Sequence, residues 1–81
     1  MIFVNNDAVM GRNIRYLRQQ QGITLQDFAA RMEIEPEALD AIEAGRLMEI
    51  DGVVLHNICG FFHIPLENLV EKDLKNHDVE Y

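Results

Sequence analysis

The side chains with the clearest chemistry are three arginines close to the start of the chain. Arg12, Arg15 and Arg18 recur at every third position, and residues 1–26 carry a single acid against them. A guanidinium group forms bidentate hydrogen bonds with two kinds of anion, carboxylates and phosphates. Residues 27–51 offer carboxylates in excess, with eight acids against two arginines. The arginines therefore have two potential sets of partners, the acids of the same chain or the phosphates of another molecule.

A second group of reactive side chains lies later in the chain. His56, Cys59 and His63 follow one another at helical spacing, so one helix face presents three zinc-type ligands. Separated ligands on one straight helix rarely close a tetrahedron unaided, and a lone buried cysteine usually packs as a small apolar side chain. We therefore expect no metal and no cofactor.

The chain lacks the residue sets that enzymes use. It contains no serine, which excludes a serine nucleophile, and no glycine-rich phosphate loop. Glu35, Glu37 and Asp40 are expected on a convex helix face rather than in a cleft. The sequence therefore indicates a binding protein and not an enzyme.

Composition limits the class further. The 81 residues allow one small domain, and 48% hydrophobic with 26% charged residues is a globular composition. The single cysteine excludes an internal disulfide, and no apolar run approaches the roughly 20 residues of a membrane helix. No signal peptide is recognisable, so we expect a cytoplasmic protein with no membrane partner. The net charge of −7 argues against general affinity for polyanions.

Helical periodicity and turn residues predict a bundle of five short helices. We expect residues 1–7 to form an N-terminal extension, residues 8–75 the domain and residues 76–81 a frayed tail. Ile2-Phe3-Val4 is too short to predict a strand; it either staples the first helix or reaches a neighbouring chain. Residues 46–50 read as a loop. Leu47 and Ile50 either fold back onto the core or form, with Met48, a small apolar patch that suits a partner or a second subunit. The expected caps and stops are Asn6 or Asp7, Gly22, Thr24, Pro36, Gly45, Asp51 and Pro65. Leu66, Leu69 and Val70 mark a short fifth helix. The expected core residues are Met10, Ile14, Leu17, Phe28, Ala29, Met32, Leu39, Ile42, Val54, Leu55, Ile58 and Phe61 or Phe62.

An ordered set of short motifs spans residues 11–69 and carries a family resemblance. The motifs are Ile14-Arg15-x-Leu17-Arg18, Gly22-Ile23-Thr24, Phe28-Ala29, Ile34, Leu39-x-x-Ile42-Glu43-x-Gly45 and Ile64-Pro65-Leu66-x-x-Leu69. Together they resemble the helix-turn-helix domain of Cro/C1-type (XRE-family) repressors. The resemblance implies an all-α, five-helix bundle of the lambda-repressor-like type and a DNA-binding transcriptional regulator. It also implies that Glu43 forms a structural ion pair with an arginine, Arg15 or Arg18.

The resemblance places base readout on the third helix, where this sequence departs from the family. Proline and alanine side chains offer no hydrogen bonds, and ionised acids accept only, so they read at most the cytosine amino group and repel phosphates. Leu25 and Glu33 also replace residues typical of the family, a polar residue and a glycine. By position, the DNA-binding or partner face of the third helix is Pro36, Glu37, Ala38, Asp40, Ala41 and Ala44.

Two functions from different classes remain. The first is a repressor-like regulator that binds double-stranded DNA, as a homodimer or not, through Arg12, Arg15, Arg18, Gln26 and Arg46 on phosphates. Four arginine contacts would give a salt slope of about −3.6, and a dimer would double it. The second is a protein-interaction module whose acidic third helix binds a basic protein partner.

Overall fold

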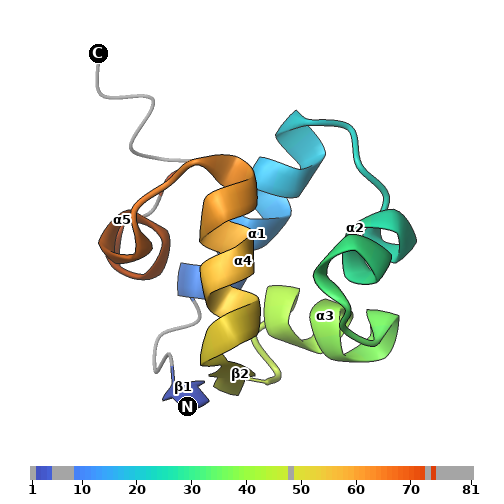
Figure 1. The fold of residues 1–81 in the computed structure, drawn as a ribbon, viewed down its shortest axis with the longest axis horizontal. Helices are drawn as coiled ribbons and strands as arrows, with labels where there is room; N and C mark the ends of the chain where they lie inside the picture. The colour runs from blue at the N-terminus through green and yellow to red at the C-terminus, as the bar shows by residue number, and fades with distance from the viewer. Residues whose placement is uncertain (1, 5–8, 48, 73, 75–81) are drawn as a thin grey trace.

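The computed structural model describes residues 2–4, 9–47, 49–72 and 74. These residues form five helices and a two-stranded antiparallel ribbon (Figure 1). The expected all-α bundle is therefore confirmed, with the ribbon as an addition. The elements are β1 (Ile2–Val4), α1 (Val9–Gln20), α2 (Leu25–Met32), α3 (Pro36–Glu43), β2 (Glu49–Asp51), α4 (Gly52–Phe62) and α5 (Leu66–Glu71).

The turns between the first three helices follow from local chemistry. Gly22 has φ +67° after α1, a left-handed conformation that favours glycine. The Thr24 hydroxyl accepts a hydrogen bond from the Asp27 N–H at 3.1 Å and so caps α2. Glu33 ends α2 in the left-handed region with φ 57°, and Pro36 opens α3. The predicted starts of α2 after Thr24 and of α3 at Pro36 are confirmed.

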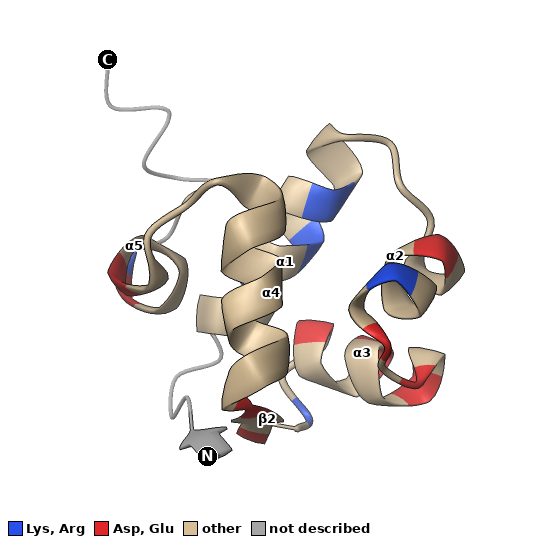
Figure 2. Cartoon of the chain, viewed as in Figure 1, with Lys and Arg blue, Asp and Glu red and all other residues tan. Residues whose placement is uncertain are grey.

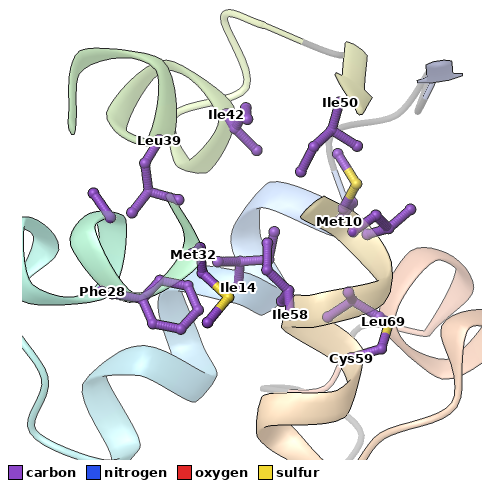
Figure 3. Packing of buried hydrophobic residues seen from close by; sticks show 12 residues of the cluster. Met10, Ile14, Phe28, Met32, Leu39, Ile42, Ile50, Ile58, Cys59 and Leu69 are labelled. Atoms are coloured by element: carbon purple, nitrogen blue, oxygen red, sulfur yellow. The ribbon is translucent and has the colours of Figure 1, made fainter. Parts of the chain in front are cut away.

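The core lies where α1, α2, α3 and α4 converge (Figure 3). The sequence analysis placed most of these side chains correctly. Leu66, which marks the start of the expected fifth helix, begins α5 and is 45% exposed. Leu17, Val54, Phe61, Phe62 and Val70 are partly buried against the core. The buried hydrophobic residues are Met10, Ile14, Phe28, Ala29, Met32, Leu39, Ile42, Ile50, Leu55, Ile58, Cys59 and Leu69.

The loop predicted over residues 46–50 is partly wrong. Glu49–Asp51 forms β2 and pairs with Ile2–Val4, with Phe3 opposite Ile50. The N-terminal run thus pairs within the chain, rather than taking either of its two expected roles. Strands of three residues carry too little alternation to be recognised, and a pairing across the length of the chain leaves no local signal. Ile50 is buried, as folding back onto the core requires, but Leu47 is 38% exposed.

Two polar or small residues of α1 fix its position. Gly11 lies against α3 so closely that a Cβ there would be 1.9 Å from the carbonyl oxygen of Ile42. Asn13 is buried, and its side-chain amide donates to the carbonyl of Leu69 at 2.6 Å and accepts from the N–H of Leu74 at 3.0 Å. The sequence analysis gave neither residue this role. Asn6, Asp7, Met48 and the tail at 76–81 lie outside the described residues.

Candidate nucleic-acid interface

A buried carboxylate joins α1 to the last turn of α3. The Glu43 side chain is fully buried, and its two oxygens accept from Arg18 Nε at 2.8 Å and Arg18 Nη2 at 2.9 Å. Arg15 Nε lies at 3.4 Å from the same carboxylate. An unpaired charge at this depth would cost several kcal/mol, so the pair holds the two helices in register. The sequence offered Arg15 or Arg18 as the partner of Glu43, and the structure uses both.

The two arginines differ in what remains available to an external anion. Arg18 is 12% exposed in its side chain, and its third hydrogen bond goes from Nη1 to the carbonyl of Ile23 at 2.9 Å. The hydrogen bond to Glu43 raises the pKa of the Arg18 guanidinium, which stays charged. Arg15 is 44% exposed and makes the longer contact. Arg18 is therefore committed to the fold, whereas Arg15 still faces solvent.

Arg15 lines a shallow hollow on the outer side of α1. The hollow holds about 440 Å³ and is also lined by Arg12, Tyr16, Gln19, Gln20 and Glu43. Arg12 is exposed and makes no ion pair within the described part of the chain. Two guanidinium groups and one carboxylate line the hollow, which leaves one positive charge in excess, while Arg18 is paired with the same carboxylate from outside the lining. Tyr16 was missed by the sequence analysis, although its spacing of four residues from Arg12 places it on the same helix face.

The outer side of α3 has the opposite character. Pro36, Glu37 and Ala44 are exposed, while Asp40 and Ala41 are half-buried. Ala38 is half-buried as well, so the residues expected on the reading or partner face all lie on α3 or at its cap with at least part of each exposed. Acidic positions lie on α2, α3 and the turn between them, and also on β2 and α5, whereas the charged positions of α1 are all basic (Figure 2). This face offers an incoming phosphate more repulsion than attraction.

Arg46 and Gln26 flank α3 from two sides. Arg46 follows the helix, is 64% exposed, and donates from Nη2 to Asp40 Oδ2 at 3.0 Å. The pair partly neutralises Asp40 at the surface. Gln26 is exposed in the first turn of α2, where its amide is free to face solvent. Both residues lie at the surface, as phosphate contact requires.

The candidate zinc ligands do not converge. His63 is the left-handed C-cap of α4 with φ 54°, one turn beyond Cys59. No group of three His, Cys, Asp or Glu side chains within the described ranges is arranged to hold a metal ion. Burial raises the pKa of the Cys59 thiol, as an apolar setting does. Nor does any described helix reach the length and apolarity that crossing a membrane requires.

The five helices, with α2 and α3 joined by a tight turn and α1 tied to α3 by the ion pair, define a helix-turn-helix protein. A family model for the Cro/C1-type HTH DNA-binding domain matches residues 13–73. The chain belongs to this family, whose members are DNA-binding regulators of transcription. No curated protein matches the sequence.

Proposed function

We propose that this protein is a repressor-like transcriptional regulator that binds double-stranded DNA mainly through phosphates, with α1 as its principal contact. The observation that carries the proposal is the excess of positive charge on the outer side of α1. Arg12 and Arg15 are exposed there beside one buried carboxylate. Phosphate contacts supply most of the affinity that does not depend on sequence, and they position the protein on the duplex.

Each basic or polar residue is assigned the DNA contact that its exposure allows. Arg12 and Arg15 bind phosphates from α1, Arg46 from the end of α3, and Gln26 donates from the start of α2. Arg18 acts through Glu43, because its hydrogen bonds orient the carboxylate that also holds Arg15. Arg18 is therefore proposed as a positioning residue rather than as a strong phosphate ligand.

Base readout by α3 is limited to what its side chains allow. Ala41 and Ala44 contact thymine methyl groups, and Glu37 accepts from a cytosine amino group. Asp40 is paired with Arg46, which partly offsets its repulsion of a phosphate. Such a helix discriminates weakly between sequences, since it lacks the bidentate donors that read guanine and adenine. A homodimer doubles the phosphate contacts and so compensates for the affinity that weak base readout does not supply.

The test is fluorescence anisotropy of a labelled random duplex with the purified chain at about 50 mM and then about 200 mM salt. Binding at the lower salt that collapses at the higher supports the proposal. No binding at either salt, by protein that melts cooperatively, rejects it. The matched control for Arg12→Ala in the same assay is Lys72→Ala, which removes one exposed positive charge outside α1 and should change the binding curve much less.

A second candidate function is favoured by one observation. Glu33, Glu35 and Glu37 are all exposed along the turn and first turn of α3, with no basic partner for them among the described residues. This acidic edge suits a basic protein partner. A lysine-rich peptide that binds the chain more tightly than a DNA duplex does would favour this function over DNA binding. The peptide should lose affinity when Glu37 is changed by Glu37→Gln.

A further inference from the structure

One long stretch of the chain carries no charge. Residues 52–66 contain no Asp, Glu, Lys or Arg, although 26% of the chain is charged. This stretch comprises α4, its cap and the first residue of α5, and α4 shows neither sign of charge along its length (Figure 2). A helix in the interior of a large protein has this character. Here α4 has a face that no described element covers.

That face contains an apolar groove of about 470 Å³ between α4 and the start of α5. Leu55 and Cys59 line it from α4, and Ile64 and Leu66 line it from the connection to α5. The space beside Gly60 is open, because a Cβ at that position would meet nothing within 4 Å. Glycine weakens the interior of a helix by roughly 1 kcal/mol relative to alanine, so the open wall lowers the stability of the isolated helix.

Two apolar side chains protrude beside the groove. Val53 is 68% exposed and Leu66 is 45% exposed, the largest values among the described large hydrophobic residues. Val53 lies one turn from His56, which lines the groove, so the protruding valine and the groove share one face of α4. An interface between two identical surfaces needs a projection beside a hollow, because the projection of each copy then fills the hollow of the other.

We propose that this face, defined as Val53, His56, Gly60, Leu66 and the groove between them, binds the same face of a second copy of the chain about a two-fold axis. The inference rests on the proposed function in that it names the surface through which the proposed homodimer forms. The charge of the chain favours a second copy as the partner that covers this face. Each copy carries a net charge of −7, and this stretch is the region where two copies meet without like charges.

Other occupants fit the face less well. A charged partner segment would bury ions without counter-ions, which is strongly unfavourable. The last residues of this chain include Lys75, Asp78 and Glu80 among 75–81, so they share that disadvantage. A dimer through α4 also leaves the helix-turn-helix uncovered, because α3 and α5 lie on opposite sides of α4 (Figure 1).

The test is sedimentation velocity of the full chain, without DNA, over about 1 to 100 µM, the range in which a micromolar dimer dissociates. The wild type should sediment as a dimer at the upper end. Val53→Asp and Leu66→Asp should each weaken the dimer at least about tenfold, as loss of a central apolar contact does. Both substitutions fall in the first turn of a helix, where the helix dipole favours an acid, so the fold should survive.

Leu47→Asp is the matched control, since it adds the same charge at an exposed apolar residue outside this face. It should dimerise as the wild type does, and thermal melts should show all four proteins folded. A wild type that remains monomeric throughout the range overturns the inference and leaves the groove to a small apolar ligand or another protein. A Val53→Asp variant that dimerises like the wild type overturns it as well. DNA binding is measured separately by anisotropy, so a dimer that binds no duplex would reject the proposed function alone.

Discussion

The two sides of α3 show how fold and function separate in this protein. The inner side carries Leu39, Ile42 and Glu43, all buried, and it follows the family pattern in residue type and spacing. The outer side carries Glu37 and Ala44, which supply none of the donors that read base edges. The inner side fixes the helix-turn-helix whatever the outer side presents. Membership of the family therefore follows from the buried half of α3, and the binding chemistry has to come from elsewhere, in our account from α1.

The largest effect is expected where α1 meets the inner side of α3. Gly11→Ala would place a Cβ at 1.9 Å from the Ile42 carbonyl oxygen, a backbone atom that cannot move aside on its own. The helices must separate, and the free energy of unfolding should fall by at least about 3 kcal/mol. Urea denaturation followed by circular dichroism measures this. Gln20→Ala, on the exposed end of the same helix, should change it little, and a Gly11→Ala variant as stable as the wild type would refute the close contact.

The next effect distinguishes Arg18 from Arg12, two of the three arginines of α1. Arg18→Ala leaves the buried Glu43 with only the longer contact to Arg15, so unfolding should become easier by about 2 to 3 kcal/mol. Arg12→Ala, its matched control on the same helix, should stay within about 0.5 kcal/mol of the wild type because the side chain is exposed. Thermal melting of the two variants side by side tests the distinction. Equal losses of stability would mean that Glu43 does not depend on Arg18.

A smaller effect is expected from neutralising the outer side of α3. Glu37→Gln combined with Asp40→Asn removes two repulsive charges and frees Arg46 from its partner. At about 1 kcal/mol for each charge near a phosphate in water, affinity for a random duplex should rise roughly fivefold per charge. Anisotropy at fixed salt measures the gain. The control Glu67→Gln, on α5, should raise affinity much less; an equal gain would show that only the net charge matters.

The smallest effect concerns the surface ion pair beside that face. Arg46→Ala breaks the contact to Asp40, in which both side chains are about half exposed or more. Exposed pairs contribute about 0.2 to 1 kcal/mol, so the melting temperature should change only slightly. A differential scanning calorimetry comparison with Asp40→Ala checks this. A loss above about 2 kcal/mol would show that the pair belongs to the fold and is unavailable to phosphates.

Much of the fold could be predicted from the sequence because its signals are local. Thr24, Gly22 and Pro36 mark helix ends through chemistry that acts over a few residues. The ribbon could not be predicted, since Phe3 and Ile50 meet only through the fold. The role of Asn13 was hidden for the same reason, because its partners lie beyond residue 68.

The sequence predicts which residues belong to the candidate site, but not how those residues are arranged in space. Residue type identified Arg12, Arg15 and Arg18 together, yet the sequence could not show that Arg18 is turned inward onto Glu43 while Arg15 keeps part of its side chain in solvent. That division depends on how closely α1 and α3 approach. The apolar groove between α4 and the start of α5 likewise depends on the angle between these two helices, which no local pattern specifies.

The most direct test of the account is the salt dependence of duplex binding by Arg12→Ala and by the wild type. If α1 binds phosphates, the variant should lose affinity for every duplex sequence about equally, and its slope of log K against log salt should become shallower by about 0.9 for each copy bound. An unchanged affinity and slope in Arg12→Ala would contradict the account and move the interface away from α1.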